Sequence, residues 1–158
     1  MESLTALVNI LKDKELKIAA AESCTGGLLG GALTSMAGSS QFFELGMVTY
    51  SNEAKIKLLG VKEDTIYQYG AVSENTAKEM AVNIKNVAGT NIGVSITGVA
   101  GPGGGSEEKP VGLVYIGVSM ENTTYIYKHL FEGNRASVRS QSVSAAIEHI
   151  LLLLVEER

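Results

Sequence analysis

Hydrophobic residues recur at intervals of three and four along four stretches of the chain, which is the spacing of an amphipathic helix. Residues that commonly cap or stop helices bracket these stretches. They are Ser3 before residues 4–14, Ser51 and Gly60 around the second stretch, Ser73 and Gly89 around the third, and Asn134 before the last. The pattern therefore predicts four amphipathic helices, and Gly26-Gly27 opens a further, glycine-rich one.

Short apolar or alternating runs between these helices predict strands. They cover residues 17–21, 46–50, 92–97, 111–119 and 123–131. The last two runs are separated only by residues 120–122, a length that suits a hairpin. Helices alternate with strands elsewhere, so the predicted fold is α/β, a three-layer α/β/α sandwich with a mixed sheet containing one antiparallel hairpin. We expect one domain over residues 1–158, with no internal repeat.

Small polar residues and glycines gather in four segments at the predicted ends of strands. These are residues 22–27, 37–40, 97–105 and 133–139. Residues 98–110 form a loop with five glycines and both prolines of the chain, and a loop of this length often binds a ligand or acts as a lid. Because ligands of open α/β sheets lie outside the carboxyl ends of the strands, we expect the four segments to share one pocket.

Composition narrows the possible partners. The 158 residues carry a formal net charge of −4 without any run of like charges, which argues against a broad electrostatic grip on nucleic acid or an anionic membrane. Cys24 is the single cysteine, so neither an internal disulfide nor a cysteine zinc site is expected, and the protein is predicted to be cytoplasmic. The apolar run 150–155 is too short to span a bilayer.

The turn at residues 22–27 presents hydroxyls and backbone N–H groups at the start of a helix, which suits a phosphate or an oxyanion. A capped helix packed closely on a sheet explains the same residues about equally well. The turn lacks the Gly-Lys-Ser/Thr of a Walker A loop, and the long loop does not satisfy G-x-G-x-x-G. A Rossmann cofactor site is therefore unsupported, and the long loop alone is equally consistent with a mobile surface segment.

Several side chains are candidates for nucleophilic catalysis. The possible nucleophiles are Ser23, Cys24, Ser39 and Ser40, and the possible bases are His129, His149 and a lysine. The histidines occupy an apolar helix and a strand surface, where structural roles are more common, which leaves a lysine as the usual alternative. Lys55 lies early in its helix, where the dipole and partial burial favour the neutral amine, although from this segment alone an exposed lysine on a helix face is the simpler explanation.

The segments together resemble the C-terminal domain of the CinA competence and damage-inducible proteins, a family that includes stand-alone nicotinamide mononucleotide deamidases. The likeness covers nearly the whole chain, and several long motifs occur in the same order. The matching residues are 21–27 (AESCTGG), 37–40 (AGSS), 48–55 (VTYSNEAK), 70–74 (GAVSE), 97–102 (TGVAGP) and 106–112 (SEEKPVG).

The resemblance implies a serine and lysine amidase that needs no metal and no cofactor. By position it suggests Ser40 as nucleophile, Lys55 as general base and Tyr50 as an assisting hydroxyl. The implied substrate contacts are Ser23, Thr25, Gly26, Gly27, Ser39, Thr97, Gly98, Gly101, Arg135 and Arg139. The substrate would be a pyridine nucleotide, nicotinamide mononucleotide, hydrolysed to nicotinate mononucleotide and ammonia, and the family leads us to expect a homodimer.

Two other functions remain open. The glycine loops and Lys55 would also suit a non-catalytic module that binds a nucleotide or phosphate. Alternatively, Cys24 would be the nucleophile of a cysteine hydrolase.

Overall fold

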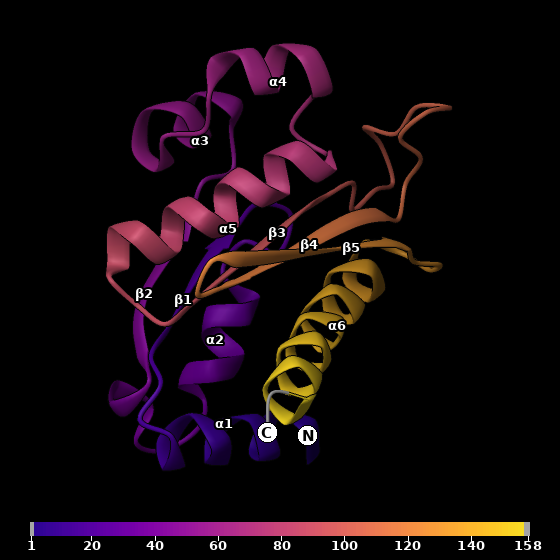
Figure 1. Cartoon of the computed structure of the whole chain (residues 1–158). Helices are drawn as coiled ribbons and strands as arrows, with labels where there is room; N and C mark the ends of the chain where they lie inside the picture. The colour runs from indigo at the N-terminus through magenta and orange to yellow at the C-terminus, as the bar shows by residue number, and fades with distance from the viewer. Residues whose placement is uncertain (1, 157–158) are drawn as a thin grey trace.

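A computed structural model describes residues 2–156 as a five-stranded mixed sheet with helices on both faces (Figure 1). The strand order is β2-β1-β3-β4-β5, with β1 parallel to β2 and β3, and β4 antiparallel to both of its neighbours. The strands are β1 Ile18–Glu22, β2 Phe43–Val48, β3 Ile92–Gly98, β4 Leu113–Met120 and β5 Thr123–Leu130. The helices are α1 Glu2–Asp13, α2 Leu28–Thr34, α3 Asn52–Leu59, α4 Glu63–Tyr69, α5 Glu74–Ala88 and α6 Arg135–Glu156, with a 3₁₀ turn η1 at Ser39–Gln41. The predicted three-layer α/β/α fold with its antiparallel β4–β5 hairpin is confirmed.

The alternation of side chains in β1 divides the core between the two faces of the sheet. Ala20 points toward the larger cluster, which α1, α2 and α6 cover, whereas Ala19 and Ala21 join a smaller cluster under α5. Helices α3 and α4 pack on the outer side of α5 and extend away from the sheet (Figure 1). Consequently α3 lies outside the larger cluster of buried side chains, and its first turn can still reach the end of the sheet.

Two glycines allow α5 to lie unusually close to the sheet. A Cβ on Gly93 would come within 2.3 Å of Ala81 O, and one on Gly117 within 2.8 Å of Ala77 O. Neither distance leaves room for a side chain. Glycine in β3 and β4 is therefore required by the helix that crosses them.

Most of the predicted helix ends are confirmed. Ser51 Oγ accepts a hydrogen bond from Ala54 N, Ser73 Oγ accepts one from Thr76 N, and Asn134 Oδ1 accepts one from Ser137 N. Gly60 and Gly89 adopt positive φ at the ends of α3 and α5.

Two expected boundaries are corrected, and two elements were not expected. Ser3 lies inside α1, which begins at Glu2. The second strand covers Phe43–Val48 rather than 46–50, because its partner β1 pairs with it from Phe43 onward. Helix α4 and the 3₁₀ turn η1 were not predicted, since neither has a long apolar repeat.

Helix α6 is long and apolar enough, by length and composition alone, to cross a membrane. Seven of its 22 residues are buried in the folded chain, and it packs against the sheet, α1 and α2. A helix that packs in the core of a folded chain passes the same test of length and composition.

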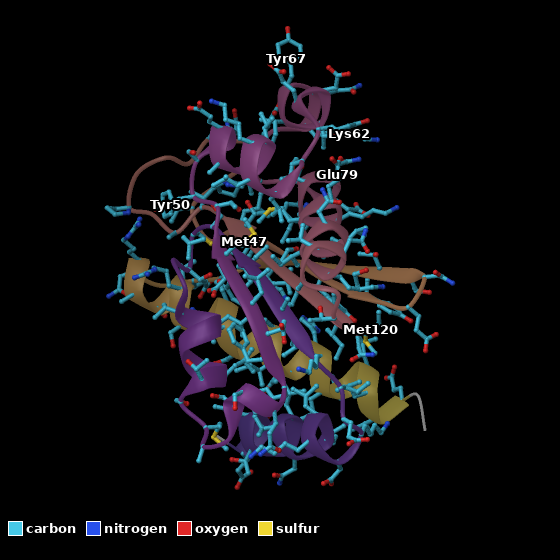
Figure 2. The ribbon with its side chains drawn as sticks, turned by 90° about the vertical axis from the view of Figure 1, so that its left-hand side faces the viewer. Met47, Tyr50, Lys62, Tyr67, Glu79 and Met120 are labelled. Carbon is cyan, nitrogen blue, oxygen red and sulfur yellow. The ribbon has the colours of Figure 1, made fainter. Side chains whose placement is uncertain are left out.

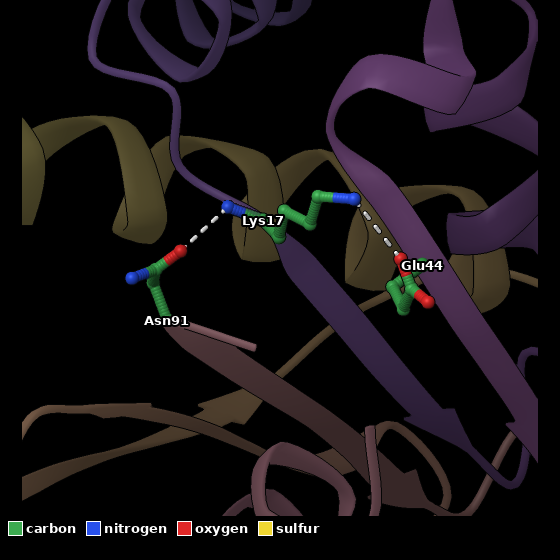
Figure 3. Close-up of polar contacts among 3 residues, drawn as sticks. All are labelled: Lys17, Glu44 and Asn91. Carbon is green, nitrogen blue, oxygen red and sulfur yellow. Dashed lines mark hydrogen bonds and ion pairs between the residues drawn. The ribbon is translucent and has the colours of Figure 1, made fainter. Parts of the chain in front are cut away.

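The amino ends of three strands are tied together at one edge of the sheet (Figure 3). The backbone N–H of Lys17 donates to Asn91 Oδ1, and its side-chain amine lies 3.3 Å from a Glu44 carboxylate oxygen. The carboxyl end of β1 lies at the opposite edge, between the ends of β2 and β3. The chain crosses first to one side of β1 and then to the other, so this carboxyl end is the topological switch point where a ligand is expected.

Candidate active site

A buried lysine lies at the switch point. Lys55 belongs to the first turn of α3 and is only 1% exposed. Its Nζ lies 2.8 Å from Thr49 O, 3.1 Å from Tyr50 O and 2.9 Å from Ser23 Oγ. Burial lowers the pKa of Lys55 from 10.5 to about 8, because the charged amine loses its hydration. About a tenth of the amine is therefore uncharged at pH 7, far more than for an ordinary lysine.

Ser23 is the first residue after β1 and faces this amine. Its backbone N–H donates to Ile96 O, which continues the pairing of β1 with β3 by one step. Its Oγ also lies 3.3 Å from Tyr50 O. When the lysine is neutral, its two N–H groups can satisfy the Thr49 and Tyr50 carbonyls while its lone pair accepts the proton of the Ser23 hydroxyl. This is the arrangement required to activate a serine.

The pair opens into a cavity of about 270 Å³. Its walls come from the turn after β1, the segment before α3, residues before α5, the loop after β3 and the start of α6. The lining residues are Ser23, Cys24, Tyr50, Lys55, Ala71, Val72, Thr97, Gly98, Val99, Ala100, Gly101, Gly103, Gly104 and Arg135. A larger cavity of about 410 Å³ lies near the opposite edge of the sheet, but its lining residues include no hydroxyl or thiol paired with a neutral base.

The turn that carries Ser23 is held by two charged side chains. The buried Glu22 carboxylate accepts hydrogen bonds from Thr25 Oγ1, Leu29 N and Gly30 N, which fixes the start of α2. From the other side, Arg139 of α6 donates to Cys24 O and Thr25 O. The nucleophile candidate therefore stands on a rigid turn, as catalytic geometry requires.

Arg135 lies at the mouth of the cavity. Its guanidinium donates to Gly101 O at 2.8 Å and to the Tyr50 hydroxyl at 3.1 Å. The Tyr50 side chain is 57% exposed, and Figure 2 shows it beside the ribbon of the glycine-rich loop. The first turn of α6 thus links the two loops that flank Ser23 and Lys55.

The predicted pairing of Ser40 with Lys55 is not found within the described chain. Ser39 and Ser40 lie in η1, immediately before β2, whereas Lys55 follows the other end of that strand. The six residues of β2 separate them, a span of about 20 Å. Ser40 is exposed at the edge where the parallel strands begin, so no ordinary loop closure joins it to the amine. The structure brings Ser23 to Lys55 instead, and Ser39 is likewise remote from the cavity.

The other expected site residues fall into two groups: some line the cavity, and the others support the turn that carries Ser23. Thr97, Gly98, Gly101 and Arg135 line the cavity together with the Ser23 and Lys55 pair. Thr97 Oγ1 also donates to Ala71 O, which ties the segment before α5 to the end of β3. In contrast, Thr25, Gly26, Gly27 and Arg139 do not line the cavity and shape or hold the turn beneath Ser23.

Cys24 lines the cavity, but burial raises the pKa of its thiol to about 11. The thiol is therefore protonated at neutral pH and is a poor nucleophile. The two histidines lie elsewhere, on β5 and α6, with their Nε2 atoms 2.8 Å apart. Between residues 2 and 156, no three His, Cys, Asp or Glu side chains are grouped so that they could hold a metal ion.

Sequence reasoning undervalued two features of this site. Ser23 is among the candidate nucleophiles, but the resemblance implies a substrate contact for it, although it directly follows a predicted strand and so has to lie at the carboxyl edge. The sequence analysis gives Glu22 no role. A carboxylate at the end of a buried apolar strand nevertheless indicates that hydrogen-bond donors surround it in the folded protein.

Comparison with known proteins assigns the family. Residues 2–154 match the CinA C-terminal domain. The chain belongs to this family. Among solved structures, a CinA superfamily protein from Klebsiella pneumoniae superposes with a TM-score of 0.95 at 34% identity, over 98% of this chain and 97% of that one. A competence/damage inducible protein from Agrobacterium tumefaciens gives a TM-score of 0.93 at 41% identity, over 97% of this chain and 93% of that one.

Curated relatives carry the same family name but are longer. A putative competence-damage inducible protein from Clostridium acetobutylicum is 56% identical over 89% of this chain, and one from Moorella thermoacetica is 50% identical over 93%. The match covers 34% and 35% of those proteins, so this CinA domain spans about a third of their length.

Proposed function

We propose that this CinA domain is a serine and lysine amidohydrolase that removes ammonia from the carboxamide of nicotinamide mononucleotide. The observation that carries the proposal is the contact of 2.9 Å between Ser23 Oγ and the buried Lys55 amine, inside a cavity at the switch point of the sheet. The substrate is inferred from the resemblance of the sequence motifs to the nicotinamide mononucleotide deamidases. The reaction class is inferred from the side chains themselves.

In the first half of the proposed reaction, Ser23 Oγ attacks the carboxamide carbon while its proton passes to Lys55 Nζ. The resulting ammonium is surrounded by Thr49 O, Tyr50 O and Ser23 Oγ, which accept its three N–H bonds. Collapse of the tetrahedral intermediate breaks the carbon–nitrogen bond, and Lys55 returns the proton to the departing nitrogen. The products of this half are ammonia and an ester on Ser23.

In the second half, the neutral Lys55 takes a proton from water, and the water oxygen attacks the ester carbon. The carbon–oxygen bond to Ser23 then breaks, the serine oxygen recovers a proton from Lys55, and nicotinate mononucleotide leaves. Each step uses the same amine alternately as base and acid. A pKa of about 8 suits this double role, because neither protonation state is inaccessible at neutral pH.

Groups around the cavity can hold the remainder of a mononucleotide. Within the described chain, the backbone N–H groups of Ala100, Gly101, Gly103 and Gly104 donate to no protein acceptor, and these residues line the cavity. Arg135 adds a positive charge at the mouth. Backbone N–H groups with an arginine form a suitable set of donors for phosphate or for a developing oxyanion.

Ammonia release from nicotinamide mononucleotide by the purified protein tests the proposal directly. We expect turnover in the wild type and a loss of at least about 1,000-fold in Ser23→Ala, with binding of the nucleotide retained. Ser40→Ala is the matched control, since it removes a hydroxyl at the opposite edge of the sheet and should leave turnover unchanged. Absence of turnover in the wild type would favour the non-catalytic phosphate-binding module, and loss in Ser40→Ala alone would reject the assignment of Ser23.

Cys24→Ala separates the serine mechanism from a cysteine hydrolase. Because the thiol is protonated at neutral pH, we expect ammonia release to stay within a few-fold of wild type. Abolished turnover in this variant together with full turnover in Ser23→Ala would establish Cys24 as the nucleophile.

The cytoplasmic location and the homodimer that the sequence leads us to expect are part of this proposal. Light scattering of the purified protein measures its oligomeric state.

A further inference from the structure

Two histidine rings form a contact outside the candidate active site. His129 of β5 and His149 of α6 approach each other with their Nε2 atoms 2.8 Å apart, and we call these two residues the histidine pair. The His149 ring stacks on Tyr127 with centroids 3.6 Å apart, and the His129 ring stacks on Phe131 at 4.8 Å. Between residues 2 and 156, the contact of the pair is the one hydrogen bond that joins the edge strand β5 to α6.

The two rings meet head-on, which fits a shared proton and not a metal ion. Their centroids are 5.0 Å apart. Because Nε2 lies about 1.1 Å from the centre of an imidazole ring, nitrogens 2.8 Å apart that point directly at each other give a centroid separation of about 5 Å. Nitrogens that bind one metal ion instead turn toward a point about 2.1 Å from each of them, which at this spacing would bring the centroids to about 4.3 Å. The contact is therefore an N–H···N hydrogen bond, donated by one ring and accepted by the other.

The histidine pair can keep this contact in only some protonation states. In the neutral pair, one Nε2 carries a proton and the other accepts it. One added proton charges one ring and leaves the N–H···N bond in place, strengthened by the charge. A second added proton puts a hydrogen on both facing nitrogens, so neither can accept, and two positive charges lie within hydrogen-bond distance. The doubly protonated pair must therefore separate.

Burial opposes protonation of both rings. It lowers the pKa of His129, and burial together with the charge of His129 lowers the pKa of His149. The ordinary pKa of histidine is about 6.5, so below this value the folded chain binds fewer protons than the unfolded chain. The contribution of the histidine pair to stability is therefore complete above about pH 6.5 and is lost progressively as the pH falls through the lower values of the folded state.

Acidic groups near the histidine pair do not reverse this effect. Glu148, which precedes His149 in α6, raises the pKa of that ring, but by less than burial and the charge of His129 lower it. Neither ring has a carboxylate partner within the part of the chain that the structure describes. The charge state of the pair is therefore set mainly by its burial and by the two rings themselves.

The remaining neighbours of the pair carry little charge toward it. Lys128 lies on the opposite face of β5, because side chains alternate along a strand. The other titratable side chains on this side of the two elements are Tyr125, Tyr127 and Glu156. The facing residues of β4 and α1 are uncharged, and they are Val114, Ile116, Ser3 and Leu4.

We propose that the histidine pair is a pH-sensitive contact that fastens β5 to α6 near neutral pH and opens when both rings are protonated. The opening is local, because Arg139 separately binds the turn after β1 and lies about 15 Å from His149 along the helix. It frees the outer edge of the sheet without unfolding the core. The proposal involves neither Ser23 nor Lys55, so it does not depend on the proposed function.

Hydrogen exchange at pH 7.5 and pH 5, corrected for the intrinsic rate at each pH, tests the proposal. In the wild type we expect the protection factors of residues 123–130 to fall by about tenfold or more at pH 5, relative to those of β1. The matched control is the double variant His129→Gln/His149→Gln, whose side chains can still form a hydrogen bond but do not titrate. Its protection factors in β5 should keep a constant ratio to those of β1. An equal fall in wild type and variant would overturn the proposal.

Titration of the imidazole NMR resonances tests the shared proton in the wild type itself. We expect the histidine pair to titrate in two separated steps, and either single variant, His129→Gln or His149→Gln, to leave one ring that titrates in a single step. Two independent steps near pH 6.5 in the wild type would reject the shared proton. A higher Tm on addition of zinc chloride to the wild type, absent from the double variant, would mean that the pair binds a metal ion and would also reject it.

Discussion

Burial of Lys55 should make the stability of the fold depend on pH in a way that one substitution removes. The pKa of this amine falls from 10.5 to about 8 on folding, so the unfolded chain binds more protons than the folded chain between these values. Stability therefore rises with pH across the window from about 8 to 10.5 and is lowest below about 8. At 1.36 kcal/mol per pH unit, the full contribution of this group is about 3 kcal/mol.

Lys55→Met keeps most of the volume of the side chain and deletes the titrating amine. We expect the free energy of unfolding of the wild type to rise by about 2.5 kcal/mol more than that of the variant between pH 7 and pH 10. The variant also leaves Thr49 O without its donor and Tyr50 O with only the contact of 3.3 Å to Ser23 Oγ, but that cost is the same at every pH. It should lose ammonia release by at least about 1,000-fold.

Urea unfolding at pH 7, 8, 9 and 10, followed by circular dichroism, measures how the free energy of unfolding depends on pH for the wild type and for Lys55→Met. Groups remote from Lys55 are common to both proteins, so their contributions cancel in the difference between wild type and variant. Cys24 interacts with Lys55, but its pKa of about 11 keeps the thiol largely protonated over this range. Parallel curves over this range would mean that Lys55 has an ordinary pKa in the folded protein. That result would refute the explanation of how Ser23 is activated.

Two further variants test the support of the site and the packing of the sheet. Arg139→Ala removes both hydrogen bonds to the turn at Cys24 and Thr25, and we expect kcat to fall by about 10-fold to 100-fold with little change in the overall fold, measured by ammonia release and circular dichroism. An unchanged kcat would show that α2 alone holds the turn. Gly117→Ala forces a Cβ against Ala77 O at 2.8 Å and should destabilise the protein by about 1–3 kcal/mol in thermal or urea unfolding. Gly31→Ala in α2 is its control, because nothing lies within 4 Å of the added Cβ, and it should be neutral or stabilising. Equal effects of the two alanines would contradict the close approach of α5.

The sequence predicted the elements well where hydrophobic periodicity and capping residues agree. Ser51, Ser73 and Asn134 cap helices as expected, and the hairpin of β4 and β5 follows from two alternating runs around a short turn. Agreement was poorer for α4, which buries only Thr65 and therefore shows no apolar stripe. The start of β2 was also missed, because strand limits depend on the partner strand as much as on local sequence.

The candidate site was predicted in its components but not in its pairing. Lys55, Tyr50, Thr97 and Arg135 all meet at one cavity, as the motifs suggested. Ser40 does not, because an element that precedes a parallel strand lies at the opposite edge from an element that follows it. Ser23 meets Lys55 since β1 and β2 run parallel and both chain segments leave the sheet at the same edge.

The order of helices and strands, their caps and the clustering of small polar residues were thus determined by local sequence, since each depends on residues within a few positions of one another. Which hydroxyl faces the buried amine was decided only by tertiary structure. Contact between Ser23 and Lys55 depends on strand order, strand direction and the seating of α3 against the end of the sheet. These are relations between distant segments, and the depth of burial that lowers the pKa of Lys55 arises from the same packing.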